Sequence, residues 1–182
     1  MIAKETKLQG CFIFEPKIFE DYRGYFFESF NQNTFNEIIG KNINFVQDNE
    51  SFSQKGTLRG LHYQQGAYAQ AKLVRVIQGK VLDIAVDIRK NSPTFGEYVS
   101  VELSEENKNQ LFIPRGFAHG FVVLSDKAIF SYKCDNFYNK QSEDGIIYND
   151  KTLNIDWKLK YDELILSEKD LELPTFEVFC RS

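Results

Sequence analysis

Short runs in which apolar and polar residues alternate recur along most of the chain. The clearest covers residues 80–89, where Leu, Ile, Val and Ile at every second position share one face and Asp83 and Asp87 share the other. Successive side chains of a strand point to opposite faces, so this alternation predicts a strand. A second alternating run precedes it across a Gln-Gly-Lys turn, and we therefore predict a β-hairpin within residues 72–89.

Most of the remaining pattern is also that of strands. Helical signals are confined to two stretches. In residues 34–39, Thr34 and Glu37 form a capping-box pair and Gly40 supplies a stop signal, and a second stretch lies within residues 161–170. Further strands are predicted at residues 10–14, 24–30, 98–103, 110–113, 120–124 and 128–133. Many short strands at this spacing predict a mainly β fold, a sandwich or barrel with a few short helices.

Length and composition indicate one domain. The chain has 182 residues, 42% of them hydrophobic, and we find no repeat, low-complexity tract or linker-like stretch. We expect a single domain over residues 1–182, with a helical segment and tail at 160–182. The first residues lack the apolar core of a signal peptide, and no apolar run approaches the roughly 20 residues of a membrane span. We therefore expect a cytoplasmic protein that does not bind membranes.

Charge and cysteine content argue against several classes of protein. The net charge of −4 disfavours nucleic-acid binding, which normally needs a basic face. Cys11, Cys134 and Cys180 are odd in number, far apart and without a Cys-x-x-Cys pair. Neither a disulfide framework nor a zinc site is expected from such a set, so we predict reduced, structural thiols.

The chain has only two histidines, and both stand in glycine-bracketed segments. His62 follows Arg59 and Gly60, and His119 lies between Gly116 and Gly120. Histidine takes up and releases protons near neutral pH, and neighbouring glycines let a ligand approach closely. The pattern predicts proton-transfer chemistry, with a histidine buried for packing as the alternative at either position.

Cations gather around the first histidine. Arg59, Lys72 and Arg75 lie within 17 residues of one another in a chain that is acidic as a whole. Such a cluster could bind a small anion such as a diphosphate through bidentate arginine contacts and a lysine point charge. The alternative is that these side chains are solvated and paired with nearby acids.

The segment around His119 resembles a known superfamily motif. Pro114-x-Gly116-x-x-His119 is similar to the second motif of the cupins, which are jelly-roll barrels. Many cupins hold a metal ion with three histidines and a carboxylate, a set that two histidines cannot supply. A site of two histidines and one carboxylate remains chemically possible, but we expect no metal.

A closer resemblance covers nearly the whole chain. Successive blocks are similar, in order, to those of the dTDP-4-dehydrorhamnose 3,5-epimerases. These blocks are FEPK at 14–17, DYRGYFFE at 21–28, FVQDN at 45–49, LRGLHYQ at 58–64, KLVR at 72–75, VDIR at 86–89, SPTFG at 92–96, IPRGFAHGF at 113–121 and LSEKD at 166–170. The resemblance implies a cupin-type jelly roll, a homodimer, no cofactor and a dTDP-linked 4-keto-6-deoxy-hexose substrate in deoxysugar biosynthesis.

Inversion of a carbon beside a ketone needs a base, stabilisation of an enolate, and an acid on the opposite face. The resemblance assigns the base to His62, paired with Asp170. It assigns enolate stabilisation to Lys72 and the acid to Tyr132. It places His119 beside the sugar, with Asp83 as a possible partner. Without the resemblance, Asp170 would be read as a helix cap and Tyr132 as strand packing.

Nucleotide contacts follow from the same resemblance. Arginines suit the diphosphate, polar side chains suit the thymidine part, and Tyr138 offers an aromatic face for stacking. The positions implied are Arg23, Glu28, Gln47, Asp48, Asn49, Arg59, Tyr138, Glu143 and Lys169. In the family, N-terminal strands complete the neighbouring subunit's site, so residues 1–30, with Arg23 and Glu28, are expected to act in the partner.

The chain departs from the usual family pattern at three positions, and two alternative functions remain to be distinguished. Ala71 stands where Gly is common, Phe112 where Trp is frequent, and Arg115 where Glu is common. Arg115 could alter phosphate affinity or surface contacts. The chain could also act at one carbon only or on a related dTDP-sugar, because placement of the substrate decides this. A non-catalytic sugar-nucleotide binder is the alternative of a different class.

Overall fold

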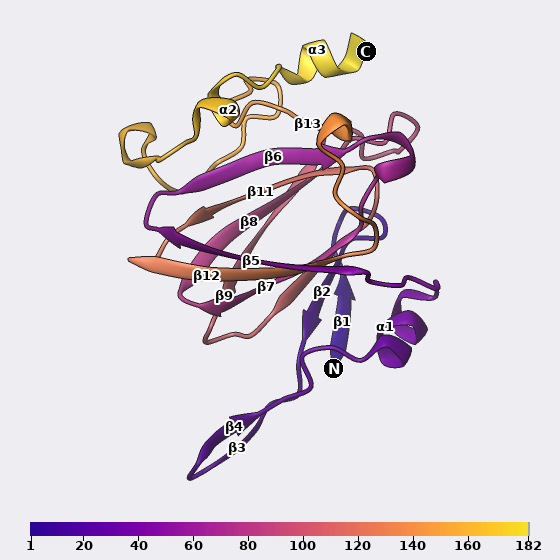
Figure 1. The fold of residues 1–182 in the computed structure, drawn as a ribbon, viewed down its shortest axis with the longest axis vertical. Helices are drawn as coiled ribbons and strands as arrows, with labels where there is room; N and C mark the ends of the chain where they lie inside the picture. Colours follow the sequence, from indigo (N-terminus) through magenta and orange to yellow (C-terminus); the bar gives the residue numbers. More distant parts are fainter. Residues whose placement is uncertain (182) are drawn as a thin grey trace.

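Two antiparallel β-sheets face each other in the computed structural model, which describes residues 1–181 (Figure 1). Ser182, the last residue of the predicted tail, lies outside the described residues. The first sheet contains, in spatial order, β1 (Ile2–Glu5), β2 (Phe12–Glu15), β10 (Gln110–Ile113), β7 (Lys72–Gln78), β12 (Lys127–Cys134) and β5 (Gln47–Gln54). The second contains β13 (Glu143–Gly145), β6 (Leu58–Gln64), β11 (Phe117–Val123), β8 (Lys80–Asp87) and β9 (Tyr98–Ser104).

The predicted mainly β fold is confirmed in its sandwich form. Within residues 1–181, no strand of one large sheet pairs with a strand of the other, so the sheets do not close into a barrel. The main core lies between them, where side chains from the inner faces meet. It includes Val74, Leu111 and Phe130 from the first sheet and Val81 and Leu103 from the second.

Two further apolar clusters cover the outer faces. On the second sheet, Ile84 and Val86 pack with Trp157 and Phe176 of the C-terminal segments, which lie beside β6 in Figure 1. On the first sheet, Phe35 of α1 (Gln32–Ile39) packs with residues of β2, β7 and β10. The C-terminal region also contains α2 (Glu168–Leu171) and α3 (Phe176–Arg181).

The predicted hairpin at residues 72–89 is wrong. Both strands form, but β7 pairs with β10 and β12, whereas β8 pairs with β9 and β11. Gly79, at φ 79°, turns the chain from one sheet into the other, and a Cβ there would lie 2.1 Å from the carbonyl oxygen of Lys127. Alternation identified each strand correctly, but it does not specify which strand becomes the partner.

The helices also differ from the predicted ones. Helix α1 begins at Gln32, because the side chain of Asn31 accepts hydrogen bonds from the first free backbone N–H groups; Thr34 is not the cap. Gly40 ends the helix in the left-handed conformation, as predicted. The stretch at 161–170 divides into a 3₁₀ turn at Tyr161–Glu163 and the start of α2.

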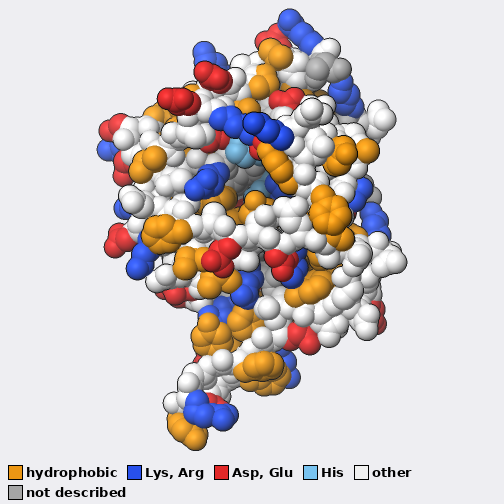
Figure 2. Space-filling view, viewed as in Figure 1, with side chains coloured by type: hydrophobic (Ala, Val, Ile, Leu, Met, Phe, Trp, Pro, Cys, Tyr) orange, Lys and Arg blue, Asp and Glu red, His pale blue; other side chains and the backbone are white. Residues whose placement is uncertain are grey.

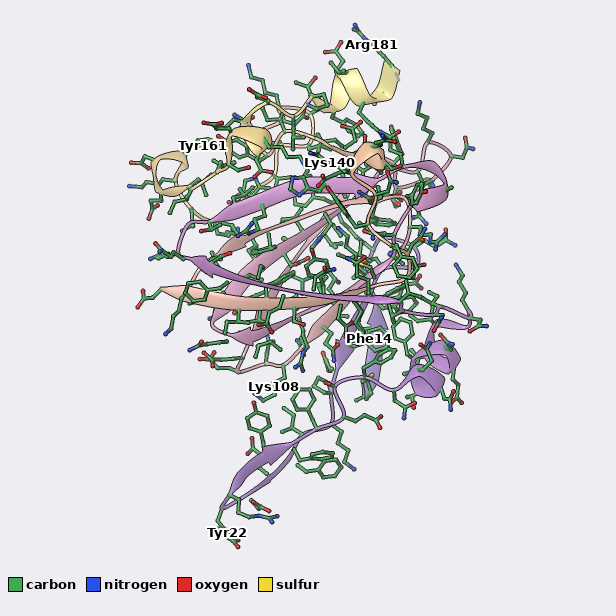
Figure 3. All side chains as sticks on the ribbon, viewed as in Figure 1. Phe14, Tyr22, Lys108, Lys140, Tyr161 and Arg181 are labelled. Carbon is green, nitrogen blue, oxygen red and sulfur yellow. The ribbon has the colours of Figure 1, made fainter. Side chains whose placement is uncertain are left out.

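A small hairpin projects from the body of the molecule. It consists of β3 (Phe19–Asp21) and β4 (Gly24–Phe26), and all six strand residues are exposed. Tyr22 lies at its tip and Arg181 at the other end of the molecule (Figure 3). The predicted strand at 24–30 therefore ends early, at Phe26.

Candidate active site

Polar side chains line two adjoining cavities between the sheets, of about 230 and 300 Å³. His62, Lys72 and Tyr132 line both of them. Figure 2 shows the hollow, with histidine side chains at its floor and cationic side chains beside it. The structure thus brings together residues from β6, β7 and β12, which the sequence analysis had placed in one site.

His62 is paired with Asp170, 108 residues away in the sequence. The imidazole Nε2 lies 2.6 Å from Oδ1 of Asp170, and the hydroxyl of Ser167 donates to Oδ2 of the same carboxylate at 2.6 Å. Burial opposes ionisation of Asp170, but hydrogen bonds from His62, Ser167 and the Gly60 backbone N–H hold its pKa below the ordinary value. The ionised carboxylate keeps Nε2 protonated and leaves Nδ1 as the ring atom that can accept a proton.

His119 lies directly across from His62 in the β11–β6 ladder and forms a second pair. Its Nε2 lies 3.0 Å from both carboxylate oxygens of Asp83. Burial lowers the pKa of His119 and raises the pKa of Asp83, although each group favours the charged form of the other. Asp83 points inward from β8, so the polar side of that strand faces the site.

Lys72 and Tyr132 stand on the opposite wall from His62. They come from β7 and β12 of the first sheet, whereas His62 belongs to the second. Burial lowers the pKa of the Lys72 ammonium and raises the pKa of the Tyr132 phenol. The ammonium lies 5.9 Å from the Tyr132 ring centroid, and within residues 1–181 it has no hydrogen-bond or ion-pair partner. Its donors are therefore free for a ligand oxygen.

Several predicted nucleotide contacts also line these cavities. Gln47 and Asn49 point inward from β5, and Tyr138 donates a hydrogen bond to Glu143 at 2.7 Å. Lys169 lies 2.5 Å from the same carboxylate. Burial acts against ionisation of Glu143, but these two partners hold its pKa below the ordinary value. Arg59 lines the other cavity with Lys169 and donates to the hydroxyl of Ser53.

Four predicted residues are not brought into the cavities of a single chain. Asp48 alternates to the outer face of β5, where its carboxylate accepts from Lys133 at 2.9 Å. Arg75 alternates outward from β7 and stacks over Phe27, so the predicted cation cluster loses one member. Arg23 belongs to the projecting hairpin, and Glu28 accepts from Asn31 outside the cavities.

The structure also adds residues that the sequence analysis missed. The hydroxyl of Ser51 is buried in the wall of the larger cavity and has no hydrogen-bond partner among residues 1–181. Ser167 supports Asp170, as described above. The signal for Ser51 was present, because residues 47, 49, 51 and 53 of β5 are all polar and share one face. A polar inward face is unusual for a sandwich strand and marks a ligand cavity.

Neither a metal site nor a membrane span is found in the part of the chain that the structure describes. Residues 1–181 contain no group of three or more histidine, cysteine, aspartate or glutamate side chains placed to hold a metal ion. No helix among these residues is both long enough and apolar enough to cross a membrane. Cys11, Cys134 and Cys180 form no disulfide within the described residues 1–181.

Proteins similar to this chain are found both by sequence and by structure. A protein from Shigella flexneri, a dTDP-4-dehydrorhamnose 3,5-epimerase, is 58% identical over 92% of this chain and 91% of its own length. The crystal structure of the enzyme of that name from Elizabethkingia anophelis superimposes with a TM-score of 0.95 at 57% identity, covering 98% of this chain and 97% of its own.

A third similar protein has been solved with a ligand. It is the dTDP-6-deoxy-D-glucose-3,5-epimerase of Legionella pneumophila in complex with dTDP-4-keto-L-rhamnose, with a TM-score of 0.93 and 50% identity over 97% of this chain and 93% of its own. The sequence model of the dTDP-4-dehydrorhamnose 3,5-epimerases matches residues 5–178. Because this model covers most of the chain and the Shigella flexneri protein is 58% identical to it, this chain belongs to the dTDP-4-dehydrorhamnose 3,5-epimerase family.

Proposed function

We propose that this chain inverts C3 and C5 of dTDP-4-dehydro-6-deoxy-D-glucose to give dTDP-4-dehydro-L-rhamnose, without a cofactor. The observation that carries the proposal is the position of His62 and Tyr132 on opposite sheets, facing one cavity. A base and an acid on opposite walls can remove a proton from one face of a carbon and return one to the other. Family membership names the substrate and the two carbons.

The reaction begins at His62. Its Nδ1 takes the proton from the carbon beside the C4 ketone, and the electron pair of the C–H bond moves into an enolate whose charge rests on the C4 oxygen. The neighbouring Asp170 stabilises the imidazolium that results. Lys72 stabilises the enolate oxygen, an interaction whose loss typically costs about 10²–10³ in rate.

Tyr132 completes each inversion. Its phenol donates a proton to the opposite face of the carbon, and the C4 carbonyl forms again as the electron pair returns to carbon. Because burial raises the pKa of this phenol, it stays protonated at neutral pH. Exchange with water then restores His62 and Tyr132 for the second carbon. His119 lines the same cavity beside the sugar.

The nucleotide lies along the polar walls that extend from the reacting groups. Gln47, Asn49 and Glu143 bind the thymidine part, Tyr138 stacks on the base, and the cations Arg59 and Lys169 bind the diphosphate. The support for this placement is that all six side chains line the two cavities that share His62.

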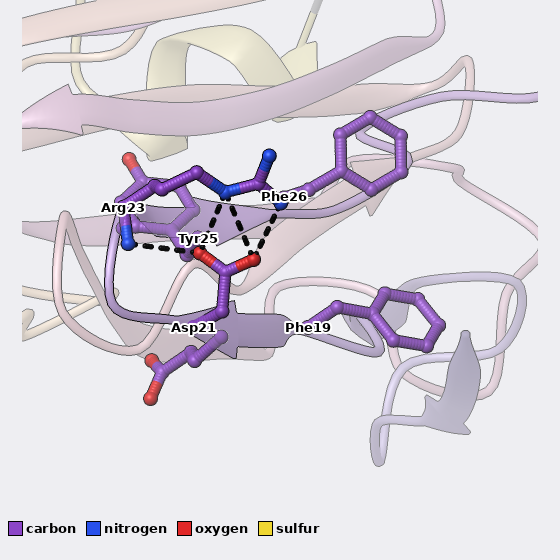
Figure 4. A pocket seen from close by; sticks show the side chains of 7 residues that line it. Phe19, Asp21, Arg23, Tyr25 and Phe26 are labelled. Atoms are coloured by element: carbon purple, nitrogen blue, oxygen red, sulfur yellow. Dashed lines mark hydrogen bonds and ion pairs between the residues drawn. The ribbon is translucent and has the colours of Figure 1, made fainter.

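The functional unit is a homodimer in which each chain forms one jelly-roll domain over residues 1–182. Residues 1–30 reach the site of the partner, where Arg23 and Glu28 contact the nucleotide. The support is the projecting hairpin, whose aromatic side chains Phe19, Tyr22 and Phe26 are all more than half exposed. Figure 4 shows Arg23 bonded to Asp21 on this hairpin, and Figure 1 shows the hairpin projecting from the body of its own chain. Three unpaired cysteines support action in the reducing cytoplasm.

The proposal is tested by incubating the protein with dTDP-4-dehydro-6-deoxy-D-glucose in deuterated water and locating deuterium by NMR. We expect label and inversion at both C3 and C5, unchanged after exhaustive treatment with EDTA. Label at one carbon only would identify a single-carbon epimerase. No label, with dTDP still bound, would identify a non-catalytic binder. If EDTA abolished turnover and one divalent ion restored it, a metal ion and not Lys72 would be the group that stabilises the enolate.

A further inference from the structure

Three strands of the first sheet end together beside the backbone of Lys72. In the ladder β10-β7-β12, Lys72 pairs with Ile113 on one side and with Cys134 on the other. The residue before Lys72 is Ala71, and the residue after Cys134 is Asp135. Arg115 follows β10 by two positions. The ends of all three strands therefore contribute to one small region of backbone.

Asp135 joins these three ends. Its Oδ1 accepts a hydrogen bond from the Ala71 backbone N–H at 2.6 Å, and its own N–H donates to the Ala71 carbonyl at 3.1 Å. Its Oδ2 accepts from Nε of Arg115 at 2.8 Å. The side chain of Asp135 is 10% exposed, so water competes little for these bonds. The Arg115–Asp135 pair thus spans β7 and fixes the residue that precedes Lys72.

This pair lies on the opposite side of the sheet from the catalytic cavities. Ala71, Arg115 and Asp135 line a separate cavity of about 440 Å³ near α1, together with Phe112. Successive residues of a strand point to opposite faces, so Lys72 projects inward where Ala71 faces outward. Arg115 and Asp135 therefore do not line the substrate site and can act on it only through the strand.

We propose that Arg115 and Asp135 are positioning residues that hold the start of β7 so that the Lys72 ammonium meets the C4 oxygen of the substrate. This inference rests on the proposed function, in which Lys72 stabilises the enolate. The ammonium has no hydrogen-bond or ion-pair partner within residues 1–181, so its place depends on the backbone that carries it and on the cavity walls. A displacement of about 1 Å in a catalytic group can cost up to about 10²-fold in rate.

The decisive variants exchange the chemistry of the pair. Arg115→Glu places a second carboxylate beside Asp135. The two negative charges repel each other, which drives the Asp135 carboxylate away from the Ala71 backbone N–H. Arg115→Glu combined with Asp135→Asn restores the arrangement, because the asparagine oxygen accepts from Ala71 while its NH₂ group donates to the new glutamate. The matched control is Lys80→Glu. It places a second carboxylate beside Glu102 in an exposed ion pair of the other sheet, where Lys80 Nζ lies 3.2 Å from Glu102 Oε1.

We expect Arg115→Glu to lower kcat by about tenfold, with the KM for the sugar nucleotide and the Kd for dTDP within about threefold of wild type. The double variant should recover most of kcat, and Lys80→Glu should leave it unchanged. A kcat for Arg115→Glu within about twofold of wild type would overturn the proposal. A double variant no more active than Arg115→Glu alone would overturn it too.

A second readout separates this inference from the proposed function. In protein labelled with ¹³C-lysine, the Cε resonance of Lys72, assigned with Lys72→Arg, reports the position of the side chain without any substrate. It should shift in Arg115→Glu and return in the double variant, while the Ala71 amide loses and regains its protection from hydrogen exchange. An unchanged Lys72 resonance would overturn the inference even in an active enzyme. Absence of turnover in wild type would instead refute the proposed function and leave this test valid.

Discussion

The two histidine–aspartate pairs are neighbours in one cavity but have opposite electrostatic surroundings. The side chain of His62 is 27% exposed, and its partner Asp170 has a lowered pKa. The side chain of His119 is 8% exposed and that of Asp83 is fully buried, and burial lowers the pKa of the first and raises that of the second. The first pair favours a carboxylate that can stabilise an imidazolium. The second favours neutral partners.

The difference shows that burial and hydrogen-bond supply, and not residue type, decide what such a pair can do. Asp170 accepts from Ser167 and the Gly60 N–H in addition to His62, so its charge is compensated. The carboxylate of Asp83 has the bonds from His119 but no access to water. A positive charge on His62 also lowers the pKa of His119 across the ladder. We therefore expect the first pair to take part in proton transfer and the second to have a mainly structural role.

The largest expected effect is that of His62→Ala. Deuterium exchange at C3 and C5 should fall by about 10³-fold, because the variant lacks the side chain placed to take the proton. Binding of dTDP, measured by calorimetry, should stay close to wild type. Exchange within about threefold of wild type would remove His62 from the role of base.

Tyr132→Phe should separate the two halves of the reaction. Proton removal by His62 continues, and the imidazolium can return a deuteron to the same face, so the substrate becomes labelled with its configuration retained. Formation of inverted product, followed by NMR, should fall by about 10²-fold. Inversion at a rate near that of wild type would show that water or another group is the acid.

Asp170→Asn and Asp83→Asn compare the partners directly. We expect Asp170→Asn to lower kcat by about 10²-fold, since the amide cannot stabilise the imidazolium. Asp83→Asn should lower it by less than about tenfold, because burial already favours the neutral form of Asp83. Equal losses in kcat from the two isosteric variants would contradict the contrast drawn between the pairs.

For the free energy of unfolding we expect the reverse order, with a larger loss at the His119–Asp83 pair than at the His62–Asp170 pair. His119→Ala leaves Asp83 buried without its partner and should lower the free energy of unfolding by about 2–4 kcal/mol, measured by urea titration. His62→Ala should cost less than about 1 kcal/mol, because Asp170 keeps two other donors. A larger loss of stability in His62→Ala than in His119→Ala would contradict this assignment.

The smallest expected effect is a shift in pH dependence. Burial lowers the pKa of Lys72, so the charged form is present below that pKa and is lost as pH rises through it. In the pH profile of kcat, the midpoint of the alkaline limb should therefore lie below about pH 10.4, the ordinary lysine pKa. Lys72→Arg should move this limb upward, because the guanidinium stays charged. A limb unmoved in Lys72→Arg would assign it to another group.

Hydrophobic alternation predicted the strands that build the core, including β7 and β12, but missed two other strands that carry site residues. The strand at 110–113 was predicted with its correct bounds, and β8, β9 and β12 nearly so. Strands β5 and β6 were not predicted, although they carry Gln47, Asn49, Arg59 and His62. Their inward faces are polar because they line a ligand cavity, and a method that looks for an apolar face cannot detect them.

The sequence by itself determined the fold class, the family and the main chemical groups, because these depend on residue type and order. Motif blocks identified His62 and Lys72 from neighbours within a few positions, and the wider resemblance assigned Tyr132. The resemblance also paired Asp170 with His62, and the structure places them in contact across 108 residues. Only the tertiary structure decided which of the predicted groups face the cavity and which strands pair. It turned Asp48 and Arg75 to the outer face and sent β7 and β8 into different sheets. Strand pairing and side-chain burial are long-range properties, and local alternation does not specify them.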